Sequence, residues 1–182
     1  MKKLLVVVDM QNDFIDGSLG TKEAEKIVPN VVKKISEWDG DIIATQDTHT
    51  ENYLQTNEGK HLPVKHCIEH TEGHRINKDV FNALCKSDGE YKSFSALNKR
   101  TFGSTVIPKL IRGGDYDYIE LIGLCTDICV ISNALLLKAN YPETPIAVDA
   151  SCCAGVTVES HNAALLTMKM CQIDIIGDDK ND

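Results

Sequence analysis

The chain has 182 residues, of which 42% are hydrophobic and 25% are charged, so it can bury a core without needing disulfides or a structural metal. Its 19 Lys and Arg residues against 27 Asp and Glu residues give a net charge of −8. Because nucleic acids and anionic membranes repel such a charge, neither is expected as the main partner. No apolar run approaches the about 20 residues that a membrane span requires.

Short apolar runs rich in Val and Ile alternate with longer segments of helical spacing. In chain order, this pattern predicts strands at residues 4–8, 41–45, 90–97, 118–124, 146–149 and 173–176. It predicts helices at residues 24–38, 77–86, 105–112, 127–139 and 158–170. The alternation predicts an α/β fold, a Rossmann-like three-layer sandwich whose six-stranded, mainly parallel sheet carries helices on both faces.

The start of the chain and its cysteines indicate the compartment. The first apolar run ends at Asp9, which is too early for a signal peptide. The seven cysteines are an odd number and contain no Cys-x-x-Cys pair, which favours reduced thiols over a disulfide framework or a zinc ribbon. We therefore expect a cytoplasmic protein with a single domain over residues 1–182.

Polar or sulfur-containing side chains follow four of the predicted strands. They are Asp9, Asp47 with His49, Lys99, and the cysteines of residues 125–129. In a parallel sheet the carboxyl ends of the strands share one edge, and ligands bind there near the point where strand order reverses. The sequence therefore predicts that these groups form one site.

Cys129 is a candidate nucleophile within this site. If Thr126 or Asp127 caps the following helix, Cys129 lies in its first turn, where the helix dipole lowers the pKa of a thiol. Backbone N–H groups there can bind an oxyanion, and Asp9 could take the thiol proton. Cys125 has a similar position, and either cysteine could instead be a packing residue.

A possible metal site lies in residues 46–75, a segment without clear periodicity that holds five of the six histidines. We interpret this segment as an insertion that carries ligands. The candidates are Asp47, His49, Glu58, His61 and His66. Mixed carboxylate and imidazole ligands suit zinc, iron or manganese. The alternative is a polar loop whose histidines are solvated.

Five motifs in order resemble those of the isochorismatase-like cysteine hydrolases, most closely their nicotinamidase branch. They occupy residues 8–14 (VDMQNDF), 45–49 (TQDTH), 62–67 (LPVKHC), 99–104 (KRTFGS) and 123–130 (GLCTDICV). The resemblance implies that Asp9 is the general base and that Cys129 is the nucleophile that forms a thioester. It further implies that Lys99 completes the triad and that the N–H groups of Cys125 and Cys129 form the oxyanion hole. A cis peptide is implied between Leu124 and Cys125.

The resemblance also implies one divalent metal, most simply zinc, that holds a pyridine nitrogen. Its ligands would be Asp47, His49 and His66, with Glu58 ahead of His61 as a fourth. Phe14 would form part of the pocket wall. The implied function is the hydrolysis of nicotinamide, or a close heteroaromatic amide, to the acid and ammonia. The implied partner is therefore a small-molecule amide, and we expect a homo-oligomer.

Two features of the sequence depart from the nicotinamidase pattern. The aromatic residue usual before the Pro near the metal His is replaced by Leu62, and Pro63 stands one residue further from His66. Lys92 lies in a segment that mimics the motif of Lys99. Three alternatives remain open: a hydrolase of another amide, carbamoyl or vinyl-ether substrate, a catalytically silent member, and a redox role for Cys125 with Cys129.

Overall fold

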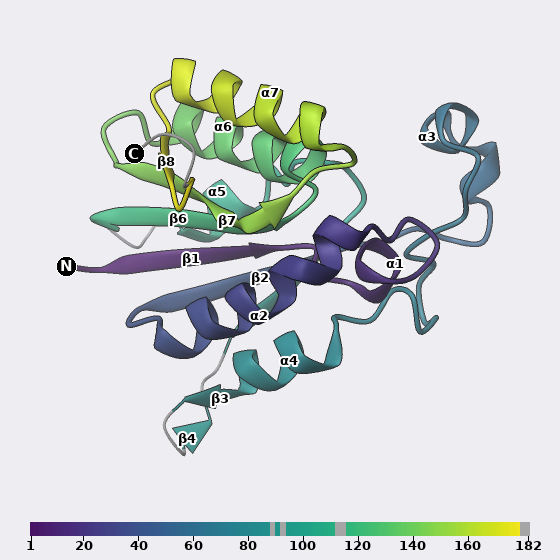
Figure 1. Ribbon diagram of the computed structural model, residues 1–182, viewed down its shortest axis with the longest axis horizontal. Coiled ribbons are helices and arrows are strands. Elements are labelled where there is room, and N and C mark those ends of the chain that lie inside the picture. Colours follow the sequence, from purple (N-terminus) through teal and green to yellow (C-terminus); the bar gives the residue numbers. More distant parts are fainter. Residues whose placement is uncertain (88–89, 92–93, 112–115, 179–182) are drawn as a thin grey trace.

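The structure is a computed structural model that describes residues 1–87, 90–91, 94–111 and 116–178. Its centre is a six-stranded sheet with the order β5-β2-β1-β6-β7-β8, in which all neighbouring strands are parallel (Figure 1). The strands are β1 (Lys3–Val8), β2 (Asp41–Asp47), β5 (Ser95–Lys99), β6 (Tyr118–Leu124), β7 (Ile146–Ala154) and β8 (Asp174–Ile176). The predicted α/β sandwich is confirmed.

Helices cover both faces of this sheet, as Figure 1 shows. One face carries α2 (Lys22–Glu37) and α4 (Lys78–Cys85). The other carries α5 (Ile107–Leu110), α6 (Ile131–Asn140) and α7 (Val158–Met170). The short elements α1 (Asn12–Ile15), η1 (Tyr53–Gln55) and α3 (Asn57–His61) lie beyond the carboxyl ends of the strands. Within the described part of the chain, none of the helices has the length and apolar character to cross a bilayer.

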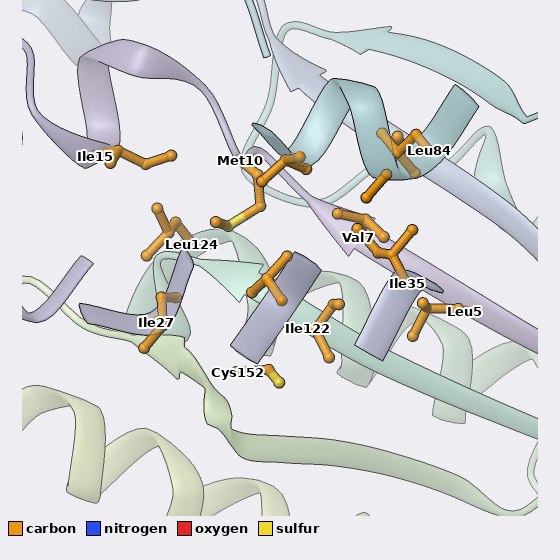
Figure 2. Close-up of a cluster of buried hydrophobic side chains, with 14 of the residues drawn as sticks. Leu5, Val7, Met10, Ile15, Ile27, Ile35, Leu84, Ile122, Leu124 and Cys152 are labelled. Carbon is orange, nitrogen blue, oxygen red and sulfur yellow. The ribbon is translucent and has the colours of Figure 1, made fainter. Parts of the chain in front are cut away.

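The alternation of side chains along β1 explains why both faces are covered. Leu5 and Val7 pack against α2 and α4 in the cluster that Figure 2 shows. Leu4, Val6 and Val8 point to the opposite face and pack under α5, α6 and α7. Because β1 is central and buried on both sides, it appears in the sequence as a continuous apolar run.

Two predicted elements differ from the structure at the edge of the fold. Of the strand predicted over residues 90–97, β4 (Glu90–Tyr91) pairs antiparallel with β3 (Lys86–Ser87), β5 joins the main sheet, and residues 92–93 lie outside the described ranges. Periodicity alone could not show that the two ends of this segment pair with different strands. The helix predicted over residues 105–112 is a single turn, Ile107–Leu110, and residue 112 lies outside the described ranges.

An ion triad of one partly buried lysine and two buried carboxylates ties α2 to the sheet. The Lys34 Nζ atom lies 2.7 Å from Glu120 Oε1 on β6 and 2.8 Å from Asp149 Oδ2 on β7. The Tyr118 hydroxyl donates to Glu120 and the Ser151 hydroxyl to Asp149. Burial lowers the pKa of Lys34, but the hydrogen bonds to both carboxylates outweigh it and raise that pKa above its ordinary value. Lys34 is therefore a charged residue that compensates two buried carboxylates.

We expect Lys34→Met to lower the free energy of unfolding by about 3 kcal/mol, because it leaves Glu120 and Asp149 buried without a counter-charge. Urea unfolding at neutral pH measures this loss. Lys33→Met is the matched control, since Lys33 is the exposed neighbour in the same helix; its effect should stay within about 0.5 kcal/mol. Equal effects of the two substitutions would contradict a stabilising role for the triad.

Candidate active site

Four predicted site residues converge at the carboxyl edge of the sheet, where strand order reverses on either side of β1. Asp9 follows β1, Asp47 ends β2 and Lys99 ends β5. Cys129 lies in a π-helical turn, Thr126–Val130, that follows β6. All four side chains are buried. The parallel topology thus brings these residues together at one edge of the sheet, as their spacing in the sequence predicts.

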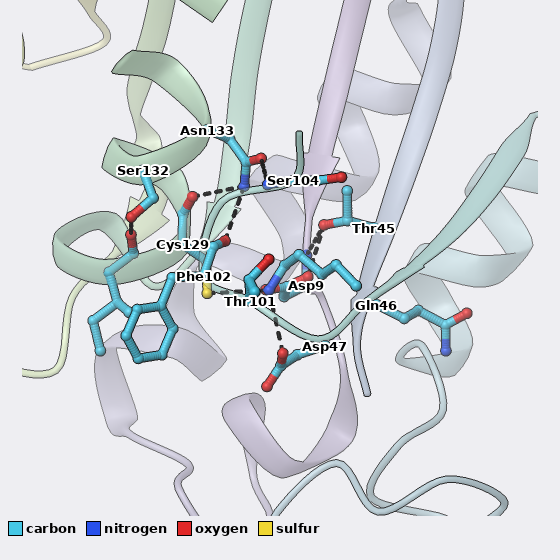
Figure 3. Close-up of polar contacts among 12 residues, drawn as sticks. Asp9, Thr45, Gln46, Asp47, Thr101, Phe102, Ser104, Cys129, Ser132 and Asn133 are labelled. Carbon is cyan, nitrogen blue, oxygen red and sulfur yellow. Dashed lines mark hydrogen bonds and ion pairs between the residues drawn. The ribbon is translucent and has the colours of Figure 1, made fainter. Parts of the chain in front are cut away.

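Lys99 links the other three residues. Its Nζ atom lies 2.6 Å from Asp9 Oδ2 and 3.3 Å from both Cys129 Sγ and Asp47 Oδ1. Figure 3 labels these three partners. Burial lowers the pKa of Lys99, but the carboxylates of Asp9 and Asp47 outweigh it, so the pKa is raised and the ammonium persists. The structure thus places Lys99 beside Asp9, whereas Lys92, the other lysine considered, lies outside the described residues.

Asp9 is held in a fixed position and in an unusual backbone conformation. The Thr45 hydroxyl donates to Asp9 Oδ1 at 2.7 Å, and the Asp9 φ angle is 46°, in the left-handed region that non-glycine residues rarely occupy. Burial raises the pKa of the Asp9 carboxyl, and Lys99 opposes this rise. A carboxylate with a raised pKa is a better proton acceptor than an exposed one.

The pKa expected for Cys129 is wrong. We expected a helix N-terminus to lower it, whereas burial and the neighbouring Asp9 raise it well above its ordinary value, with Lys99 acting in the opposite sense. The sequence indicates the position of the thiol in the turn but not that the thiol is buried against a carboxylate. Cys129 is therefore a protonated thiol at rest and needs a base to become a nucleophile.

The capping expected at this turn is also wrong. Cys125 is the N-cap residue, and its carbonyl accepts hydrogen bonds from Ile128 and Val130. The Thr126 hydroxyl instead lies 2.8 Å from His161 Nδ1 on α7, and the Asp127 carboxylate accepts from a backbone N–H of the loop before α7. These side chains anchor the turn to α7 rather than cap it. The Leu124–Cys125 peptide is cis, as the resemblance implies.

The candidate metal ligands form a second cluster beside the first. His49 Nε2 lies 2.9 Å from Asp47 Oδ2 and 3.5 Å from Glu58 Oε1. His66 Nε2 lies 3.6 Å and 3.8 Å from the same two atoms. One ligand atom from each of these four residues lies within 4.8 Å of all the others. His61 points away and bonds the Asn57 carbonyl on the exposed side of α3.

The chemistry of this cluster fits a divalent cation. His49 Nε2 is buried and has no hydrogen bond of acceptable geometry among the described residues. His66 Nδ1 lies 2.9 Å from the Val64 carbonyl, which places its proton on Nδ1 and turns Nε2 toward the cluster. The ring of Tyr53 packs against both histidines, and the ring of Phe14 lies 5.5 Å from that of His66. Two imidazoles and two carboxylates suit zinc, iron or manganese.

Several supporting residues were missed by the sequence reasoning. The Gln11 side chain donates to the Asp47 carbonyl at 2.9 Å and accepts from the Asp47 N–H at 2.7 Å, which fixes the end of β2. The Asp13 carboxylate accepts from the Cys67 N–H at 2.7 Å, next to His66. Gln11 and Asp13 both belong to the motif of residues 8–14, which was therefore a signal that they are functionally relevant. Their hydrogen-bond partners are distant in sequence, so these contacts were not predicted.

The chain is similar to several known proteins over nearly its whole length. Nicotinamidase/pyrazinamidase of Mycobacterium tuberculosis is 22% identical over 188 residues, covering 96% of this chain and 98% of that protein. The crystal structure of a Streptococcus mutans pyrazinamidase/nicotinamidase is 27% identical with a TM-score of 0.81, over 96% of this chain and 100% of that one. A Pyrococcus horikoshii pyrazinamidase in complex with zinc is 26% identical with a TM-score of 0.75, over 97% and 99%.

The family model described as the isochorismatase domain matches residues 3–178, which is nearly the whole chain. That range begins with β1, ahead of Asp9, and extends beyond β8, so it includes the complete sheet and both side-chain clusters. By this match the chain belongs to the isochorismatase family.

Proposed function

We propose that this protein is a metal-dependent cysteine amidase that hydrolyses nicotinamide, or a close heteroaromatic amide, to the acid and ammonia. The observation that carries the proposal is the contact between the two clusters: Lys99 lies 3.3 Å from Asp47 as well as beside Asp9 and Cys129. A thiol with its base thus stands next to a set of metal ligands. Relatives that share this fold are named for nicotinamide and pyrazinamide hydrolysis.

The first half of the proposed reaction forms a thioester. Asp9 takes the proton of Cys129, and the sulfur attacks the amide carbonyl carbon while the Lys99 ammonium stabilises the thiolate. The N–H groups of Cys125 and Cys129 are the candidate donors to the oxyanion. The protonated Asp9 then gives its proton to the departing nitrogen, the C–N bond breaks, and ammonia leaves.

The second half regenerates the enzyme. Asp9, again ionised, takes a proton from a water molecule whose oxygen attacks the thioester carbonyl. The C–S bond breaks, the thiolate of Cys129 recovers the proton from Asp9, and the carboxylic acid is released. One water is consumed for each amide hydrolysed, and no oxidant or reductant is needed.

Asp47, His49, Glu58 and His66 would hold the metal, with zinc the simplest choice for this donor set. When bound, the metal would supply a Lewis acid that orients the ring nitrogen of the substrate. Phe14, beside His66, would form a wall of the ring pocket. Fixing the ring in this way leaves the amide carbon to face Cys129, and such positioning can contribute large effective molarities.

Ammonia release from a panel of amides, with nicotinamide and pyrazinamide first, tests the proposal. We expect a stoichiometric divalent metal in the purified protein. Chelation or His49→Ala should raise the KM for nicotinamide sharply and slow turnover by about 10- to 100-fold or more, because the ring loses its anchor. Acyl substrates without a ring nitrogen should respond much less.

His61→Ala is the matched control for this prediction, because His61 lies in the same segment but outside the cluster. It should leave metal content and kinetics unchanged. Metal-free protein that hydrolyses nicotinamide at full rate would show that the cluster is a polar loop, and the proposed role of the metal would then be wrong.

The residues that precede His66 in the sequence favour a second candidate substrate class. Leu62 and Val64 are each more than a third exposed, and Pro63 stands between them. None of these side chains can stack on a heteroaromatic ring as an aromatic residue would. If this protein acts instead on a non-aromatic amide, carbamoyl or vinyl-ether group, it should form product from such substrates and none from nicotinamide. A silent member would turn over no member of the panel.

A further inference from the structure

Asn133 on α6 makes an unusual set of contacts for a residue that is only 1% exposed. Its Nδ2 donates to the Cys129 carbonyl at 2.8 Å and to the Phe102 carbonyl at 3.3 Å. Its Oδ1 accepts from the Ser104 N–H at 2.8 Å. Figure 3 shows the amide lying between the turn that carries Cys129 and the loop that carries Phe102 and Ser104.

The partners of Asn133 belong to the two segments that carry the nucleophile and its neighbouring cation. Cys129 is itself the candidate nucleophile, and residues 100–104 are the loop that leaves β5 directly after Lys99. This loop lies close to α6, because a Cβ atom on Gly103 would overlap Leu136 and crowd Ser132. One buried amide therefore cross-links the Cys129 turn to the Lys99 loop.

We propose that Asn133 is a positioning residue that sets the distance between Cys129 Sγ and Lys99 Nζ, an inference that rests on the proposed function. These atoms lie 3.3 Å apart, and a displacement of either segment by about 1 Å can cost about 100-fold in rate. Asn133 touches neither the thiol nor the ammonium in this arrangement. It acts through the backbone on either side of them.

The neighbouring residue, Ser132, makes a side-chain hydrogen bond within its own helical segment. Ser132 Oγ donates to the Ile128 carbonyl, four residues earlier in the same segment. A serine at position 133 could make the equivalent bond to the Cys129 carbonyl, but its short side chain could not reach Phe102 or Ser104. Asn133→Ser thus keeps the bond within the turn and removes the cross-link, whereas Asn133→Leu removes both.

The test compares Asn133→Ser and Asn133→Leu with the control Ser132→Ala, at a temperature where all are folded by circular dichroism. We expect kcat for the best amide to fall about 100-fold in Asn133→Leu and at least about 10-fold in Asn133→Ser, with KM within about threefold of the parent. Ser132→Ala should keep the parent kcat. A residue that only stabilised the fold would lower the melting temperature without this change in kcat.

A second measurement does not depend on the substrate. The alkylation rate of Cys129 by iodoacetamide, followed by mass spectrometry on the peptide that contains it, should fall about tenfold in both Asn133 variants, because a displaced thiolate loses the Lys99 ammonium. An alkylation rate and a kcat in Asn133→Ser that both equal those of the parent would overturn the proposal. If Asn133→Leu does not fold, Asn133→Ser alone is sufficient for this test. If the parent hydrolyses no amide, the proposed function is wrong, and alkylation still tests Asn133.

Discussion

Cys129→Ala should reduce amide hydrolysis by more than about 10⁴-fold, because removing the nucleophile of a catalytic unit costs nearly as much as removing the whole unit. The fold should survive, since the change deletes one sulfur atom from a buried position and costs about 1 kcal/mol. Metal content should also survive, because Cys129 is not among the four clustered ligands. Turnover, unfolding and metal analysis on one preparation separate these three effects.

Cys125→Ala is the matched control for this result. It lies in the same segment, but its proposed contribution is a backbone N–H, which alanine retains. Burial raises the pKa of both thiols, that of Cys125 to about 12, but it is the Cys129 sulfur that lies 3.3 Å from the Lys99 ammonium. We expect activity within about tenfold of the parent and an acid-quenched acyl adduct on the Cys129 peptide. A dead Cys125→Ala with an active Cys129→Ala would reverse the assignment.

The parts of the site that the sequence predicted are those that depend on strand ends. Asp9 directly follows β1, and Asp47 is the last residue of β2. A parallel sheet brings all such ends to one edge, so no side-chain geometry was needed to group them with Lys99 and Cys129. Short apolar runs likewise predicted five of the six strands of the sheet, whereas the strand at β5 was predicted from an alternating pattern over residues 90–97.

Contacts that depend on three-dimensional packing could not be predicted in this way. Asn133 is an ordinary polar residue in a helical pattern, and only the structure shows that its amide faces both the Cys129 carbonyl and the Ser104 N–H. Gln11 likewise bonds the backbone of Asp47, 36 residues away. The raised pKa of Cys129 has the same origin, because burial against Asp9 leaves no local mark in the sequence.

The two charged partners of Cys129 should respond differently to neutralisation. Asp9→Asn keeps the shape of the side chain but removes the proton acceptor, so turnover should fall by about 10³-fold or more. Lys99→Met should abolish turnover as well, and it also leaves the carboxylate of Asp9 buried without the ammonium that pairs with it. Breaking such a pair costs about 3 kcal/mol or more, whereas Asp9→Asn removes a buried charge and leaves Lys99 paired with Asp47.

The double variant Asp9→Asn with Lys99→Met tests this reasoning. If the two residues act as one unit, its turnover should be no lower than that of the worse single variant. Its free energy of unfolding should recover part of the loss seen in Lys99→Met, because the buried carboxylate that lost its counter-charge is gone. Additive losses in both turnover and stability would mean that Asp9 and Lys99 act independently, and the proton path from Cys129 to Asp9 would have to be reassigned.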